Sequence, residues 1–143
     1  MSTPSLSLSP SANRIAWICQ IIAAIIMGQT LFFKFAGAPE PVYIFTTLGV
    51  EPWGRLAAAG SELVACVLLL IPATAHLGAL FTLGIMGGAI MAHLTKLGVV
   101  VLDDGGLLFG MGVATSVAAL IVLWLRKEAV LDMIRIFTGG KSR

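Results

Sequence analysis

The sequence predicts an all-α integral membrane protein, built as an antiparallel four-helix bundle with a short interfacial helix between the first and second spans. Of its 143 residues, 58% are hydrophobic and only 11% are charged. Soluble domains average about 25% charged residues, so this chain has too few charges to cover its own surface in water. It also contains four apolar runs, each close to the ~20 residues that a helix needs to cross the hydrocarbon. Membrane strands need only about ten residues and alternate in polarity, which these runs do not.

The four runs define the expected spans. They cover residues 15–33, 56–76, 77–95 and 107–125. Pro72 and the following "ATAHLG" predict the hairpin turn between the second and third spans, because proline ends or kinks a helix. The letters "AGA" at 36–38 are similar to a signal-peptide cleavage box. Lys34 precedes them and Pro39 follows at once, so we expect the first run to remain as a span.

The segments outside the spans divide the chain into three parts. Residues 1–13 are rich in Ser and Pro and predict a disordered cytoplasmic tail before a membrane domain of residues 14–126. Residues 127–143 predict a cytoplasmic amphipathic tail, since their apolar residues recur at helical spacing. A solvated end of the fourth helix explains that spacing equally well. Between the first two spans, a pair of prolines favours a short helix over "VYIFTTL", lying in the outer membrane interface.

The distribution of Lys and Arg predicts the orientation. With four spans, both termini and the hairpin turn share one side of the membrane. That side holds six basic residues: Arg14, Arg126, Lys127, Arg135, Lys141 and Arg143. The other side holds three: Lys34, Arg55 and Lys96. Because cytoplasmic loops carry an excess of Lys and Arg, we expect both termini to be cytoplasmic.

Small residues repeat every four positions along three of the spans. The rows are Ala57, Ser61 and Ala65 in the second span, Gly84, Gly88 and Ala92 in the third, and Gly106, Gly110, Ala114 and Ala118 in the fourth. Such rows let helix backbones approach closely in lipid. They predict a compact antiparallel four-helix bundle.

Glu62 is the acidic residue within the second run. It lies seven residues past Arg55, hence about 10 Å below the outer end of its helix. A charge at that depth costs at least a few kcal/mol, so the carboxyl group is either ionised and paired or protonated, and it faces the bundle interior. The candidate partners are Lys34, Arg55 and His93, with Thr30 on the same helical face as Lys34. This cluster is either a polar lock that fixes helix register or a site for a ligand or a proton.

The remaining polar residues have simpler interpretations. His93 is either a hydrogen-bonded interior side chain or a ligand-binding one; His76 is about 25 Å away along the helix, too far to share a haem with it. Asp103 and Asp104 predict a turn and a helix N-cap, or an acidic rim above the Glu62 pocket. The two cysteines have no CxxC spacing, and we expect buried, unreactive thiols. No Cys/His cluster indicates a metal site, and no basic, aromatic-rich patch indicates nucleic acid.

Taken together, three motifs resemble those of the DoxX-like family of small four-span membrane proteins. They are "LFFKFAG" with Lys34, "GSELVACVLLLIP" with Glu62 and "MGGAIMAHL" with His93, and "LDDGGLLFG" before the fourth span also fits. The resemblance covers residues 14–126. It implies a four-helix bundle in the cytoplasmic (inner) membrane, with Lys34, Glu62 and His93 at the polar motif positions. Some relatives are subunits of quinone-linked oxidoreductases or of complexes that protect against oxidative stress, and others are assembly factors.

Two functions are therefore expected, from different classes. The first is a redox-associated membrane subunit that binds a quinone or another small hydrophobic molecule beside Lys34, Glu62 and His93, next to a redox partner subunit. The second is a non-catalytic scaffold or assembly factor, in which the polar residues are structural and the small-residue faces bind other helices or a second copy. The sequence leaves open whether any catalysis occurs. Solute transport ranks last, because no pair of broken helices is present.

Overall fold

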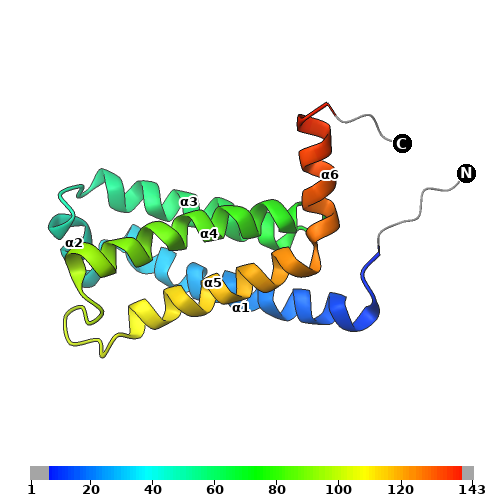
Figure 1. The fold of residues 1–143 in the computed structure, drawn as a ribbon. Coiled ribbons are helices and arrows are strands. Elements are labelled where there is room, and N and C mark those ends of the chain that lie inside the picture. Colours follow the sequence, from blue (N-terminus) through cyan, green and yellow to red (C-terminus); the bar gives the residue numbers. More distant parts are fainter. Residues whose placement is uncertain (1–6, 140–143) are drawn as a thin grey trace, which may run out of the picture.

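The computed structural model describes residues 7–139, and within them every regular element is helical. Figure 1 shows their order: α1 (Pro10–Ala36), α2 (Pro39–Thr47), α3 (Trp53–Leu70), the 3₁₀ turn η1 (Pro72–Thr74), α4 (Ala75–Ala92), the π-helical turn η2 (His93–Leu97), α5 (Leu107–Leu125) and α6 (Lys127–Phe137). Four helices are long and apolar enough to cross a membrane: α1, α3, α4 with its flanking turns, and α5. The helical elements, and the length and apolarity of these four helices, confirm the prediction of an all-α, multi-pass membrane protein.

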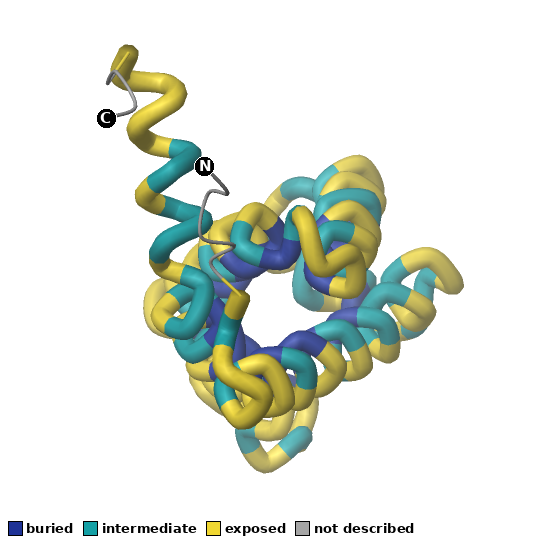
Figure 2. The backbone as a smooth tube through the Cα atoms, turned by 90° about the vertical axis from the view of Figure 1, so that its right-hand side faces the viewer, coloured by how far each residue is buried: buried dark blue, intermediate teal, exposed yellow. Residues whose placement is uncertain are grey.

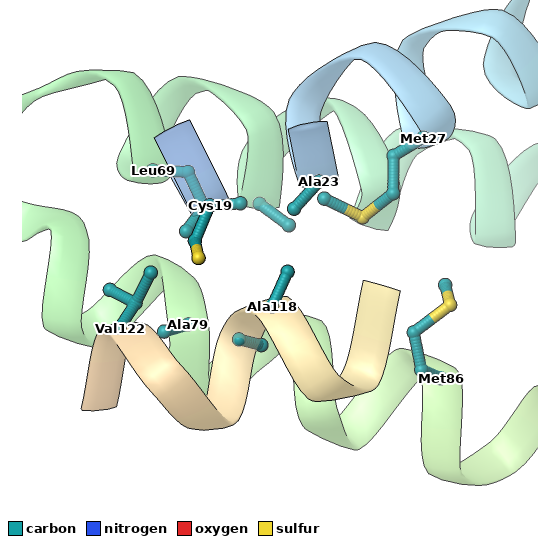
Figure 3. Close-up of a cluster of buried hydrophobic side chains, with 10 residues drawn as sticks. Cys19, Ala23, Met27, Leu69, Ala79, Met86, Ala118 and Val122 are labelled. Atoms are coloured by element: carbon teal, nitrogen blue, oxygen red, sulfur yellow. The ribbon is translucent and has the colours of Figure 1, made fainter. Parts of the chain in front are cut away.

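The four long helices pack side by side. α1 contacts α3 and α5, and α4 contacts the same two helices. In a view along the helix axes, the buried residues face a common centre (Figure 2). The apolar core lies in the half of the molecule near η1 and the end of α5, where small side chains such as Ala23, Ala79 and Ala118 meet Cys19 and Met27 (Figure 3). The opposite half, which carries α2, η2 and residues 98–106, is called the α2 end below.

The predicted boundary of the N-terminal tail at residue 13 is wrong. α1 begins at Pro10, because the hydroxyl oxygen of Ser9 accepts a hydrogen bond from the Ala12 N–H at 3.2 Å and caps the helix. Proline is well suited to the first helical position, where its missing N–H is not needed. Residues 1–6 of the predicted tail lie outside the described residues.

The break between the second and third spans falls at Pro72, where the sequence predicted the hairpin turn, although the apolar run itself continues to His76. α3 ends at Leu70, and His76 belongs to the first turn of α4 instead of ending the second span. The cause is Pro72, which forces the residue before it out of the helical region: Ile71 has φ −95° and ψ 117°. The Thr74 hydroxyl donates to the Leu68 carbonyl at 3.0 Å and closes the turn.

Several glycines of the predicted small-residue rows do not lie at close contacts between helices. A Cβ atom added at Gly84, Gly88 or Gly110 would meet nothing within 4 Å. The close approach occurs instead beside η1, where a Cβ at Gly78 would lie 2.5 Å from the Leu69 backbone nitrogen. α3 and α4 therefore touch at their hairpin and separate toward the α2 end. Of the predicted rows, Ala65 and Ala118 are buried in the core.

Both predicted accessory helices are present as helices. α2 begins at Pro39 and reaches Thr47, close to the predicted segment. α6 is separated from α5 by a break at Arg126 and leaves it at a steep angle, so it is not a continuation of the fourth long helix (Figure 1). Leu131 and Ile134 on α6 are exposed. Residues 140–143 lie outside the described residues.

Candidate functional site

Lys34 and Glu62 form an ion pair between α1 and α3. The Lys34 Nζ atom lies 2.7 Å from Oε1 and 2.9 Å from Oε2 of Glu62. The side chains are only 16% and 4% exposed. The Thr30 hydroxyl, one helical turn before Lys34, is 3.4 Å from Oε2 and also 3.0 Å from the Met27 carbonyl. The predicted pairing of Glu62 with a basic group on a neighbouring helix is thus present, and the partner is Lys34.

The geometry of this pair has an electrostatic consequence. Burying one unpaired charge in an apolar interior is strongly unfavourable, whereas two opposite charges in hydrogen-bond contact compensate each other. Here one ammonium group donates hydrogen bonds to both carboxylate oxygens. Both bonds are charge-assisted and therefore strong. The pair as a whole is neutral. It places two polar groups inside the helix assembly without a net charge.

Arg55 is not a partner of Glu62, contrary to the prediction. Its Nε atom donates to Glu51, four residues earlier in the chain, at 2.8 and 3.1 Å, and its Nη1 atom donates to the Lys34 carbonyl. The guanidinium also lies against Gly37, which ends α1 with φ 67°. Arg55 thus binds a backbone carbonyl in the last turn of α1. The carboxylate of Glu51, in the turn before α3, takes the Arg55 Nε that a shared helix face with Glu62 had suggested for Glu62.

His93 lies at the start of η2 on a different wall of the interior. Its Nδ1 atom is 2.8 Å from the Gly98 carbonyl oxygen, and its ring packs edge-on against Phe109 with centroids 5.7 Å apart. Because a carbonyl only accepts, Nδ1 is the donor of this bond, and Nε2 is an acceptor whenever the ring is neutral. His93 makes its bond with the π-helical turn and not with Glu62.

Asp104 holds the turn before α5, as the sequence predicted. Its carboxylate accepts backbone hydrogen bonds from Val101 at 2.9 Å, Gly106 at 2.8 Å and Leu108 at 2.9 Å. These bonds, that from the Leu108 N–H foremost, lower the pKa of the Asp104 carboxyl group below its usual value. The turn itself is tight, because Leu102 and Asp103 both adopt positive φ, at 47° and 59°.

A cavity of about 550 Å³ joins these residues at the α2 end. Lys34, Thr30, Glu62, His93 and Asp104 all border it, whereas Arg55 does not. Most of the remaining wall is apolar and includes Met27, Phe33, Ile44, Phe45, Met86 and Leu108. This size and composition are typical of sites for small molecules, which combine apolar walls with a few placed polar groups.

Three further polar side chains, which the sequence did not assign to the site, also border the cavity. They are Gln29 on α1, Glu40 on α2 and Ser61 on α3. Gln29 lies outside the helical face shared by Thr30 and Lys34, and Glu40 lies outside the four spans. Ser61 was assigned to a packing row. No sequence signal distinguishes these residues from ordinary helix positions, because their roles depend on how far the helices separate.

A second polar contact joins three helices in the other half of the molecule. The Gln20 side chain, 0% exposed, donates from Nε2 to the Leu69 carbonyl at 2.6 Å. Its Oε1 atom accepts from Nε and Nη2 of Arg126 at 3.2 and 3.0 Å. This cluster was missed, although a glutamine within an apolar run is the signal that could have indicated it.

The cysteines are free and separate. Cys19 is buried in the core, and the Cys66 thiol points at the Ala24 carbonyl, 3.7 Å away. Within the described residues no group of three or more His, Cys, Asp or Glu side chains is placed to hold a metal ion.

Comparison with known proteins finds no family model, no curated protein and no solved structure that matches the chain.

Proposed function

We propose that the protein is a DoxX-like four-span bundle of the cytoplasmic membrane with both termini in the cytoplasm. The excess of Lys and Arg on the terminal side supports this orientation. The beginning of α1 and the end of α5 lie at the same end of the molecule, as the orientation requires (Figure 1). In this arrangement α2 lies in the outer interface and α6 on the cytoplasmic surface, where its apolar face contacts lipid and its charged face contacts water.

The function that the site supports best is the binding of a small hydrophobic molecule, a quinone, in a redox-associated membrane subunit. The single observation that carries this proposal is the cavity of about 550 Å³, apolar over most of its wall, with Lys34 and Glu62 on one side and His93 on another. An apolar ring fits the wall, and its oxygens need hydrogen-bond donors at the edge. The cavity provides both.

The chain's own residues have defined tasks in this proposal. Lys34 donates a hydrogen bond to a ligand oxygen through an N–H that Glu62 does not use. Glu62 keeps that ammonium group charged and oriented, and it is positioned to relay a proton. His93 offers its Nε2 atom as a proton acceptor. A bound quinone supplies the electron chemistry, and a partner subunit exchanges electrons with it.

A second candidate function is that of a non-catalytic scaffold, alone or as a homo-oligomer. The observation that favours it is that Lys34 and Glu62 satisfy each other, so they need no ligand. The Gln20–Arg126 contact has the same character of a polar lock between helices. In this alternative both clusters fix helix register, and the exposed helix faces bind other membrane proteins.

The decisive experiment is purification from native membranes in mild detergent, followed by identification of the extracted small molecules and the retained proteins. We expect a quinone in the extract, and we expect a quinone with a decyl tail to raise the unfolding temperature. The double variant Lys34→Glu/Glu62→Lys restores an ion pair with exchanged positions. If the wild type binds quinone and the swapped variant folds but does not bind it, the ligand site is supported; if the swapped variant folds and the wild type itself binds no quinone, the scaffold is supported. Absence of quinone from the extract together with no effect of added quinone would refute the first function.

A further inference from the structure

The spacing between α3 and α4 changes along their length. Beside η1 the helices are in backbone contact, since a Cβ at Gly78 would lie 2.5 Å from the nitrogen of Leu69 and 2.8 Å from the carbonyl carbon of Leu68. Farther along α4, a Cβ at Gly84 or Gly88 would meet nothing within 4 Å. The hairpin is therefore closed at one end and open at the other.

The open part is bordered by very small side chains. Ala58 and Ser61 on α3 and Gly84 and Gly88 on α4 all border the cavity; we call these four residues the α3–α4 opening. Both glycines are exposed, so the opening reaches the outer surface of two membrane-spanning helices. At its inner side, Ser61 directly precedes Glu62 in α3. The opening thus connects the surface that faces lipid with the Lys34–Glu62 pair.

We propose that the α3–α4 opening is a lateral entrance from the bilayer, and that it holds the single aliphatic tail of a ligand whose polar head lies beside Lys34 and Glu62. The inference rests on the proposed function and specifies the ligand of the same cavity. An apolar tail in this position exchanges lipid contacts for contacts with the opening, and the head reaches its hydrogen bonds without crossing water. The ligand is therefore an amphiphile dissolved in the membrane.

The charges on the cavity wall indicate a head that carries no negative charge. The Lys34–Glu62 pair is neutral, while the carboxylates of Glu40 and Asp104 border the same cavity. Asp104 is stabilised as an anion by three backbone N–H groups. An anionic head such as a fatty-acid carboxylate meets like charges there, whereas a neutral head with a carbonyl or hydroxyl group bonds to Lys34 without that repulsion.

The test compares two double variants that add equal bulk. Gly84→Leu/Gly88→Leu fills the opening, and the space at each Cβ indicates that the helices fold unchanged. The control is Gly87→Leu/Gly110→Leu, since these two glycines are equally unobstructed but do not border the cavity. Both proteins and the wild type are reconstituted in phosphatidylcholine vesicles. The probes are a benzoquinone ring with a decyl tail and the same ring without the tail.

We expect the filled opening to weaken binding of the tailed probe by about tenfold, the loss that follows when roughly two methylene groups are no longer buried. Binding of the tail-free ring should change less than about twofold relative to wild type, and the control variant should bind both probes normally. Equal binding of the tailed probe by the two double variants overturns the inference.

Other outcomes separate this inference from the function on which it rests. If the wild type binds neither probe, the quinone proposal fails, and vesicle lipid retained through purification, measured by mass spectrometry, decides the inference. Lower lipid retention by the filled variant than by the control supports a tail site, and equal retention overturns it. If the wild type is a dimer and the filled variant is a monomer with normal tail binding, the opening is a contact surface for a second copy and the inference is wrong.

Discussion

The ammonium group of Lys34 contacts both carboxylate oxygens of Glu62, at 2.7 and 2.9 Å, across the contact between α1 and α3. The two residues are 28 positions apart in the chain. Their contact fixes how far α1 and α3 are displaced along each other, and it also places the polar edge of the cavity. The first prediction follows from this double role.

Replacing Lys34 by Met leaves the Glu62 carboxylate buried without its partner. We expect a loss of about 3–5 kcal/mol in the free energy of unfolding, the usual effect of breaking a buried ion pair from one side. The double variant Lys34→Met/Glu62→Met should recover most of that loss, because no uncompensated charge remains. Reversible unfolding in mixed detergent measures both values. A single variant as stable as the wild type would show that the pair has no structural role.

Replacing Gln20 by Leu removes the link between α1, the end of α3 and Arg126. We expect a loss of about 1–3 kcal/mol, because the Leu69 carbonyl and the Arg126 guanidinium lose a buried hydrogen-bond partner. Gln29→Leu is the matched control on the same helix: Gln29 is exposed, and its replacement should change stability by less than about 0.5 kcal/mol. Equal effects of the two substitutions in the same unfolding assay would contradict the assigned role of Gln20.

Replacing Gly78 by Ala should force the α3–α4 hairpin apart. The added methyl group would lie 2.5 Å from the Leu69 nitrogen, and backbone cannot yield as a flexible side chain does. We expect a loss of about 1–3 kcal/mol, as for other overpacked sites. Gly84→Ala, with open space at its Cβ, should be neutral or stabilising by up to about 1 kcal/mol through helix propensity. Thermal unfolding of both variants side by side tests the contrast.

Acid should weaken the turn before α5 through Asp104. Its pKa is lowered in the folded state, chiefly by the hydrogen bond from the Leu108 N–H, so the folded state binds a proton less readily than the unfolded state. The resulting stability is present above about pH 4, the ordinary pKa of aspartate. It is lost as the pH falls through the lower pKa of the folded protein.

The measurement is the unfolding temperature between neutral pH and about pH 3. Asp104→Asn should be less stable than the wild type at neutral pH and should lose less stability on acidification. Asp103→Asn, on the neighbouring residue, should retain the wild-type pH dependence. Parallel curves for the wild type and Asp104→Asn would exclude Asp104 as the source of the effect.

Much of the fold could be predicted from the sequence, because length and apolarity alone define a membrane span. The positions of α1, α5 and the short α2 follow from those signals, and Pro72 indicated the hairpin. The apolar run itself continues through this turn to His76, so the limits of the run extend beyond the end of α3. A residue is apolar whether it lies in a helix or in a turn of the bundle. Hydropathy alone therefore does not show where one helix ends.

The candidate site was predictable only in part. Glu62 could be identified because a carboxylate within an apolar run needs a partner, and Lys34 is the nearest basic group at matching depth. Arg55 satisfied the same criteria but is held by Glu51. Gly84 and Gly88 form a row that is typical of tight helix contacts, but in the structure they border the cavity. Separation between helices depends on the whole packing arrangement, which no local pattern encodes.

The corner at Arg126 has a consequence for the C-terminal helix. The residue that ends α5 and precedes α6 also extends its guanidinium to a fully buried amide on α1. The interior contact thus belongs to Arg126 itself and not to the helix that follows it. Truncating the chain before this arginine would deprive the first span of an interior contact, so a shortened protein should be harder to produce in folded form than one cut just after it.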